Sequence, residues 1–399
     1  MNTMSRRDFL KTAAAVGAGS VTGPLFSPKA RAEEAETVRI GYLPITDATP
    51  LLIAHARGYF ADEGLKAEKP VRIRDWSTLS ESFLSGKFNL VHLLLPIPIW
   101  MRYHLKVPAK IMAWDHTNGS AVTVGGQSDI SGFPDLGGKQ IAVPYWYSMH
   151  NVILQLGLRK AGLKPVIRPQ DAALKSHEVN LFVLPPPEMP VALSAGKIDG
   201  FIVAEPFNAF AELRIKAKIM RFTGDIWKNH PCCVVVMNEN LIRAKPLFTQ
   251  KVLHAVVRAQ LWIKDNPEKT AKILSHKSNN YLPAPENVLQ RVFSGYANLP
   301  QYGKGNIPRA IQHPEWNTDR ISFQPWPYPS ATRFILQELR QTLVEGDTDF
   351  IRKISPDYVV KDLVDYQFVK KAIMYVGGPG KFEMIDPAQP WDREEIVAL

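Results

Sequence analysis

The sequence predicts an α/β protein of two lobes, in which mainly parallel sheets carry helices on both faces. Strand-like and helix-like segments alternate along the chain, a pattern typical of parallel sheets with helical crossovers. The alternation runs in two successive series, and a chain of 399 residues is long enough for two hydrophobic cores. Ligands of such sheets bind beyond the carboxyl ends of the strands, so two lobes in series predict a ligand-binding cleft between them that closes around the ligand.

The first series begins at residue 38. Short apolar runs bounded by turn residues predict strands, and apolar residues at helical spacing predict helices. The predicted strands are 38–43, 71–76, 109–114 and 121–124, and the predicted helices are 51–62 and 78–84. We assign residues 33–126 to the first part of lobe 1.

The second series follows a turn-rich stretch at 128–138. Its predicted strands are 141–144, 181–184, 200–203, 218–222 and 234–237, and its predicted helices are 149–161, 188–195, 206–214, 246–264 and 267–274. We assign residues 127–228 to lobe 2 and residues 229–300 to a return into lobe 1. Residues 301–399 predict a helical C-terminal extension that packs on lobe 1, with helices at 331–343 and 358–372.

The first 32 residues have the features of a twin-arginine export signal. Arg6 and Arg7 precede a short apolar stretch at 12–25, and Ala30-Arg31-Ala32 forms a small-x-small cleavage site. The twin-arginine translocase carries proteins that are already folded, so we expect a periplasmic protein with its signal cleaved near Ala32. A disordered basic N-terminus is the alternative interpretation. The apolar stretch is too short and too rich in glycine to span a membrane.

The composition is that of an ordinary soluble globular protein, with 45% hydrophobic and 22% charged residues. The formal net charge is +10, of which the first 32 residues carry +4, and the remaining mildly basic charge of +6 tolerates an anionic ligand. Lysine and arginine do not gather in runs or along a helix, so we predict no nucleic-acid partner.

The chain has two cysteines, Cys232 and Cys233, and they are neighbours. Adjacent cysteines rarely meet disulfide geometry, and a strand at this position would send them to opposite faces. His230 lies close before them, and a His/Cys cluster suggests a metal site. Because ligands so close in sequence do not readily surround an ion, we predict no metal ion and no cofactor, and two buried cysteines instead.

Several motifs carry a family resemblance. The segment YLPITDATPL at 42–51, with Ala54 and Gly58-Tyr59-Phe60, is similar to the first motif of nitrate/bicarbonate-type receptors. Their second-lobe motif resembles LPPPEM at 184–189, GKIDGF at 196–201 and AEPFN at 204–208, and TGDIWKNHP at 223–231 is similar to their return crossover. These receptors are soluble binding subunits of ABC importers in the nitrate/sulfonate/taurine group, and the resemblance covers residues 38–372.

The resemblance implies a type II periplasmic-binding-protein fold and a function without catalysis. The protein would capture a small anion or small organic solute of the nitrate, bicarbonate or sulfonate class between its lobes. Its partners would be the permease and ATPase subunits of an importer. The alternatives are an enzyme on the same fold, similar to pyrimidine-precursor synthases, and a periplasmic sensor.

The loop after the first strand is a candidate anion site. Thr46 and Asp47 precede a predicted helix, where a hydroxyl and backbone N–H groups can hold the oxygens of an anion. Asp47 would repel an anion, so its alternative role is to cap the helix. Trp76 ends a later strand and either lines the pocket or packs in the core. His92 is a further candidate ligand-binding residue.

Lobe 2 supplies a run of aromatic and polar candidates between a predicted strand and a predicted helix: Tyr145, Trp146, Ser148, Met149 and His150. Neighbouring side chains on an extended segment point in opposite directions, so three successive aromatic residues at 145–147 cannot all enter one core. We expect at least one of them to face the cleft, above N–H groups that follow a Ser148 cap. The alternative is an aromatic hinge cluster that packs the lobes together.

Glu205 and His230 complete the candidate ligand-binding residues. For Glu205 the resemblance implies a polar role, as a metal ligand or a hydrogen-bond acceptor, and the alternative is a carboxylate favoured at a helix start. The chain departs from the nitrate-receptor pattern at Cys232-Cys233, where those receptors tend to have an acidic–basic pair. A small anion needs donors to replace its hydration. The replacement of a possible lysine by a cysteine removes one such donor, and the aliphatic and aromatic residues expected around the cleft suit a larger, partly organic solute.

Overall fold

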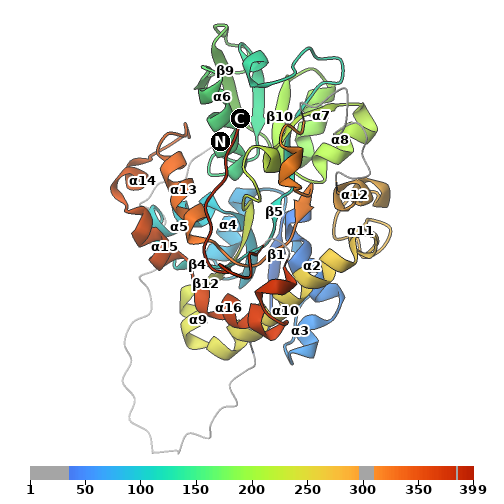
Figure 1. Cartoon of the computed structure of the whole chain (residues 1–399), viewed down its shortest axis with the longest axis vertical. Coiled ribbons are helices and arrows are strands. Elements are labelled where there is room, and N and C mark those ends of the chain that lie inside the picture. The colour runs from blue at the N-terminus through green and yellow to red at the C-terminus, as the bar shows by residue number, and fades with distance from the viewer. Residues whose placement is uncertain (1–35, 296–309, 383–384) are drawn as a thin grey trace, which may run out of the picture. The chain divides into compact units, whose positions relative to one another are not determined.

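The computed structural model describes residues 36–295, 310–382 and 385–399. The predicted signal peptide and the predicted boundary at residues 300 and 301 lie outside the described residues. Residues 36–399 form one compact unit built on two mixed sheets with helices packed against them (Figure 1). Within the described ranges, no helix is both long and apolar enough to cross a membrane.

The first sheet has the strand order β2-β1-β3-β12-β4. β1, β2 and β3 are parallel, and β12 runs antiparallel between β3 and β4. These strands are rich in apolar residues, and β3 and β4 are buried along nearly their whole length, as helix-covered strands are. The strands are β1 (Ile40–Tyr42), β2 (Val71–Arg72), β3 (Leu90–Leu94), β4 (Ala109–Trp114) and β12 (Cys233–Asn238).

The helices of this lobe include α10, which packs against α2, α3 and α16. Asp75 caps α4 by accepting a hydrogen bond from the Thr78 N–H, which explains why this helix begins at Trp76. The helices are α2 (Thr49–Ala56), α3 (Tyr59–Asp62), α4 (Trp76–Leu84), α5 (Pro96–Tyr103), α9 (Glu239–Ala244), α10 (Pro246–Asp265), α11 (Pro267–Leu274) and α12 (Glu286–Phe293).

The second sheet has the order β11-β6-β10-β7-β9-β8. β7 to β10 are parallel, and β6 is antiparallel to both β10 and β11. Its strands are β6 (Ser120–Val124), β7 (Gln140–Val143), β8 (Lys164–Val166), β9 (Glu178–Val183), β10 (Gly200–Ala204) and β11 (Lys218–Phe222). Its helices are α6 (Met149–Lys160), α7 (Met189–Ser194) and α8 (Phe207–Ile215).

Strand β6 corrects the sequence-based picture. The sequence predicted 121–124 as part of the first series, but β6 pairs with β10 and β11 in the second sheet. A short apolar run does not reveal which strand it will pair with. The chain therefore crosses from the first sheet to the second between Trp114 and Ser120, and it returns between Phe222 and Cys233. β5 (Thr117–Asn118) lies in the first crossover and pairs with β13 (Ile321–Ser322).

The C-terminal extension packs on both lobes, whereas the sequence predicted packing on lobe 1 alone. α16 contacts α10 and β4 in lobe 1, and α13 contacts α6 in lobe 2. Gln155 of α6 donates to the Leu343 carbonyl at 2.8 Å and accepts from the Leu343 N–H at 2.7 Å. The helices are α13 (Pro329–Leu339), α14 (Asp349–Lys353), α15 (Pro356–Leu363) and α16 (Tyr366–Tyr375).

Replacing Gln155 with alanine tests how firmly the extension is held on lobe 2. The substitution removes the partner of the Leu343 N–H and one of two donors to the Leu343 carbonyl, which also accepts from Asn151 at 3.1 Å, so we expect the free energy of unfolding to fall by about 1–3 kcal/mol. Urea denaturation of the mature protein measures this loss. Gln290, which is exposed on α12, is the matched control, and Gln290→Ala should change stability by less than about 0.5 kcal/mol. Equal stability of the two variants would contradict the packing described.

Candidate functional site

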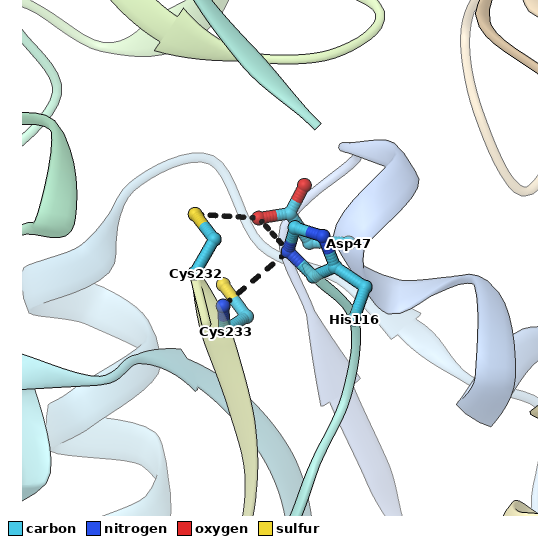
Figure 2. Close-up of side chains that lie close together, drawn as sticks. All are labelled: Asp47, His116, Cys232 and Cys233. Carbon is cyan, nitrogen blue, oxygen red and sulfur yellow. Dashed lines mark hydrogen bonds and ion pairs between the residues drawn. The ribbon is translucent and has the colours of Figure 1, made fainter. Parts of the chain in front are cut away.

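Four polar side chains meet in a buried cluster where the crossovers leave and enter the first sheet (Figure 2). Asp47 lies in a short 3-10 helix, Thr46–Ala48, that follows β1. His116 follows β4, and Cys232 and Cys233 lie at the start of β12. All four residues are 0% exposed, and one ligand atom from each lies within 4.8 Å of the others.

Asp47 and His116 form the electrostatic centre of this cluster. Oδ2 of Asp47 lies 2.8 Å from Nε2 of His116. Burial raises the pKa of Asp47, and the nearby His116 opposes this only in part. Burial alone would lower the pKa of His116, but the Asp47 carboxylate raises it well above its ordinary value. Both groups therefore hold a proton more strongly than they would in water.

Both cysteine thiols point into the same cluster, so the prediction that they diverge is wrong. The physical reason is that β12 begins only at Cys233, and the alternation of a strand does not extend to Cys232. Sγ of Cys232 lies 3.5 Å from Oδ2 of Asp47 and 3.9 Å from Nε2 of His150. Burial opposes ionisation of Cys232, but hydrogen bonding with Cys233 and the charge of His150 hold its pKa well below the usual value. Both cysteines are free thiols.

Lobe 2 contributes a second set of polar groups to the same region. His150, near the start of α6, places Nε2 2.9 Å from Oγ of Ser120 in β6. The Thr223 hydroxyl donates to the Ser120 carbonyl at 3.0 Å, and Oγ1 of Thr223 lies 2.8 Å from Nε2 of His230. Burial lowers the pKa of His230 to about 4. Imidazole and hydroxyl groups of lobe 2 and the crossover thus surround the cysteines of lobe 1.

Direct hydrogen bonds join the two lobes beside the cluster. The backbone N–H of Thr46 and its hydroxyl both donate to the Glu205 carbonyl, at 2.8 and 3.0 Å. The Glu205 carboxylate accepts from Nε of Arg320 at 2.7 Å and from the Ala209 N–H at 3.0 Å. Arg320 comes from the C-terminal extension, is fully buried, and also pairs with Glu212 at 3.0 Å. The closed arrangement of the lobes is therefore fixed by three parts of the chain.

Several buried polar atoms around the cluster have no hydrogen-bond partner within the described part of the chain. They are Asp47 Oδ1, His116 Nδ1, His92 Nδ1, His150 Nδ1 and both carboxylate oxygens of Asp115. Buried polar atoms are nearly always paired in native proteins, so this concentration of unpaired atoms is unusual. Burial raises the pKa of Asp115 well above its ordinary value.

The structure brings together five of the eleven candidates from the sequence: Thr46, Asp47, His150, Glu205 and His230 all lie at or beside the cluster. His92 lies behind it, where Nε2 accepts from the Leu43 N–H at 3.0 Å. The rings of His92 and Trp76 meet edge to face, with their centroids 5.5 Å apart.

The remaining candidates lie around the start of α6. Ser148 caps this helix by accepting from the Asn151 N–H at 3.0 Å. The Trp146 indole donates to Glu345 of the C-terminal extension at 3.1 Å. Tyr145 is half-buried and Met149 is fully buried. Contact of any of the eleven with a solute remains a prediction.

Sequence reasoning missed His116, Asp115, Ser120 and Arg320, and it dismissed the cysteines as ligands. One signal was available, because Asp115 and His116 follow a strand that the sequence did predict, as Thr46 and Asp47 do. Arg320 gave no signal, since its partner Glu205 is far away along the chain.

Two α/β lobes, joined by crossovers and closed over polar groups that both supply, define a solute-binding protein of the periplasmic type. A family model agrees with this architecture and matches residues 31–276. The chain belongs to the NMT1-like family. A model of the twin-arginine signal matches residues 3–23, and the protein is exported to the periplasm by that pathway.

Known proteins resemble most of the chain. A nitrate/nitrite binding protein, NrtA, of Nostoc is 26% identical over 411 aligned residues, which cover 90% of this chain and 88% of the relative. The solved periplasmic nitrate-binding protein NrtA of Synechocystis has a TM-score of 0.73 at 20% identity and covers 91% of this chain and 94% of its own.

A second solved structure is the ligand-binding component of an ABC-type import system from Staphylococcus aureus, with zinc bound. It has a TM-score of 0.64 at 20% identity and covers 84% of this chain and 99% of its own. At this level of identity, the two solved structures show the shared fold alone. The predicted type II binding-protein fold is confirmed.

Removing the Arg320 guanidinium should strongly destabilise the protein. Arg320→Leu leaves the Glu205 and Glu212 carboxylates facing each other in a buried site, so we expect a loss of about 3–5 kcal/mol in the free energy of unfolding. Arg333 pairs with Asp357 on the surface, and Arg333→Leu should cost no more than about 1 kcal/mol. Chemical denaturation compares the two, and similar losses would contradict the role of the buried pair.

His92 should make the folded protein sensitive to mild acid. Burial lowers its pKa to about 3, whereas an unfolded histidine binds its proton near pH 6.5. Acidification from pH 7 to pH 5 therefore favours the unfolded chain, by about 2 kcal/mol from this group. His92→Gln removes this group. Between pH 7 and pH 5 the free energy of unfolding of the variant should therefore fall by about 2 kcal/mol less than that of the wild type. Parallel stability profiles from urea denaturation at the two pH values would show this interpretation to be wrong.

Proposed function

We propose that the protein captures a small anion between its lobes and delivers it to the permease and ATPase subunits of an ABC importer. The observation that carries the proposal is the convergence of buried polar side chains from both lobes on one place, where several of them have an atom without a hydrogen-bond partner among the described residues. Asp47 and the cysteines come from lobe 1, His150 and Ser120 from lobe 2, and His116 from the crossover. A solute bound there would favour the closed over the open arrangement, because only closure brings both sets together.

The protonation of the site supports an anionic solute. Burial raises the pKa of Asp47 and of Asp115, and the Asp47 carboxylate raises the pKa of His116. A proton shared by Asp47 and His116 leaves this pair without a net negative charge, so it would not repel an anion. His150 and Ser120 supply further polar atoms. Nitrate, which the relatives bind, and bicarbonate and small sulfonates are the solutes to test.

The relatives reported above are binding proteins for transport rather than enzymes. We propose that this chain likewise catalyses no reaction and that the cluster serves binding. Delivery to a membrane partner follows from export to the periplasm together with the family, and the partner subunits remain part of the proposal.

The proposal is tested by adding nitrate, nitrite, bicarbonate or methanesulfonate to the mature protein. At a hundredfold excess over its dissociation constant, a solute stabilises the folded protein by about 2.7 kcal/mol. We therefore expect the melting temperature to rise by a few degrees with one of the four anions. Small-angle scattering should show no expansion on binding. The absence of any shift with all four anions would overturn the proposed solute class.

A pair of histidine variants locates the binding site. His150→Ala removes an imidazole at the cluster, so we expect the affinity for the active anion to fall at least about tenfold, equivalent to about 1.4 kcal/mol. His177 is exposed, and His177→Ala should leave the affinity unchanged. Isothermal titration calorimetry measures both variants. Unchanged affinity in His150→Ala would place the solute elsewhere.

A further inference from the structure

We propose that Asp47, His116, Cys232 and Cys233 form a binding site for a thiophilic divalent metal ion of the zinc class. The inference goes beyond the capture of an anion and does not depend on which anion is bound. It also replaces the expectation, drawn from the sequence, that no metal binds here. The four residues are brought together from three separate parts of the chain, which proximity in sequence could not reveal.

The donor set selects the class of metal. It offers two thiol sulfurs, one imidazole nitrogen and one carboxylate oxygen. Structural and catalytic zinc sites are built from these three ligand types, with four ligands in a tetrahedron. Calcium and magnesium prefer oxygen ligands alone, so the cysteines disfavour them.

The distances suit an ion of this size. Zinc bonds of about 2.0–2.3 Å imply ligand atoms about 3.3–3.8 Å apart at the corners of a tetrahedron. Sγ of Cys232 lies 3.5 Å and Nε2 of His116 lies 2.8 Å from Oδ2 of Asp47, and all four ligand atoms lie within 4.8 Å of one another. Shifts of about one ångström would place the four around a single ion. Figure 2 shows the four side chains close together.

The hydrogen bonding within the cluster is incomplete without a cation. Nε2 of His116 lies 2.8 Å from the Asp47 carboxylate, an acceptor, and 3.3 Å from the Cys233 N–H, a donor. One ring nitrogen cannot donate to the first and accept from the second at the same time. Asp47 Oδ1 and His116 Nδ1, both fully buried, have no hydrogen-bond partner among the described residues. An ion between Oδ2 of Asp47 and Nε2 of His116 would remove the conflict at Nε2, because both atoms would then donate lone pairs to the metal.

The metal site shares Asp47, His116 and the cysteines with the proposed anion site, but the anion site also has groups from lobe 2. The four ligands come from lobe 1 and the first crossover, whereas His150 and Ser120 belong to lobe 2. His150 lies 3.9 Å from Sγ of Cys232 and 2.9 Å from Oγ of Ser120, at the edge of the four-residue cluster. These lobe 2 groups remain available to a solute when an ion occupies the four ligands.

Export in the folded state fits a thiol-based metal site. Thiols must be reduced to bind metal, and the cytoplasm keeps them reduced, whereas the periplasm favours oxidation. A chain that folds before export can enclose its cysteines and load the ion in the cytoplasm. Because metal binding is coupled to folding, the loaded site would also stabilise the protein.

The test is a zinc titration of the mature protein after chelation under reducing conditions. We expect one equivalent of Zn²⁺ to bind, as measured by competition with a chromophoric chelator and by elemental analysis. Cys232→Ser, Cys233→Ser, Asp47→Asn and His116→Gln should each weaken binding at least about tenfold. His177→Asn, which changes an exposed histidine, is the control and should bind as the wild type does. Co²⁺ provides a second readout, since thiolate ligation gives an intense absorption band that Cys232→Ser and Cys233→Ser should each reduce.

Three results would overturn the inference. The wild type could fail to bind one equivalent of Zn²⁺, or folded variants of the four ligands could bind as tightly as the wild type. The third is recovery of Cys232 and Cys233 from the periplasm as a mutual disulfide. If a variant fails to fold, the Co²⁺ spectrum of the wild type still decides, because a spectrum without thiolate bands excludes the cysteines. If the wild type binds an anion but no Zn²⁺, this inference alone is overturned. If it binds Zn²⁺ but none of the four anions, the proposed function alone is overturned.

Discussion

Buried polar groups that lack partners are the constraint on which this structure depends. Asp47, Asp115, His116 and His150 lie out of contact with water, and each has at least one polar atom without a hydrogen bond among the described residues. Leaving such atoms unpaired costs roughly 1–3 kcal/mol each, so a stable protein would not retain so many in one place without compensation. In the proposed function a bound guest would provide that compensation, and its binding energy would then favour closure of the lobes.

The rest of the architecture holds this cluster together from several directions. Two crossovers carry His116 and His230 past it, and the Thr46–Glu205 hydrogen bonds join the lobes beside it. The C-terminal extension adds Arg320, which is buried against Glu205, and packs helices on both lobes. Separating the lobes would break the Thr46–Glu205 hydrogen bonds, and the extension would have to lose its contacts with one lobe or move with it. The extension therefore holds the two lobes together in this arrangement, which packing on one lobe alone would not do.

Much of the fold could be read from the sequence, and little of the site could. The alternation of strands and helices located most elements, because burial imposes local patterns that survive in the chain. The pairing of β6 with the second sheet was missed, since strand pairing is decided by contacts distant in sequence. The same limit applies to the site. Asp47 and His230 lie in recognisable motifs, but the convergence of Asp47, His116 and the cysteines is created by topology. The expectation that Cys232 and Cys233 diverge failed because β12 begins only at Cys233, so the alternation of a strand does not extend to Cys232.

A crystal structure of the mature protein purified from the periplasm would test the central claim most directly. The account predicts density that belongs to neither protein nor water between Asp47 and His150, in contact with the polar atoms that have no protein partner. It would be contradicted if those atoms were satisfied by protein and water alone, with no space for a guest, while a solute occupied another part of the molecule.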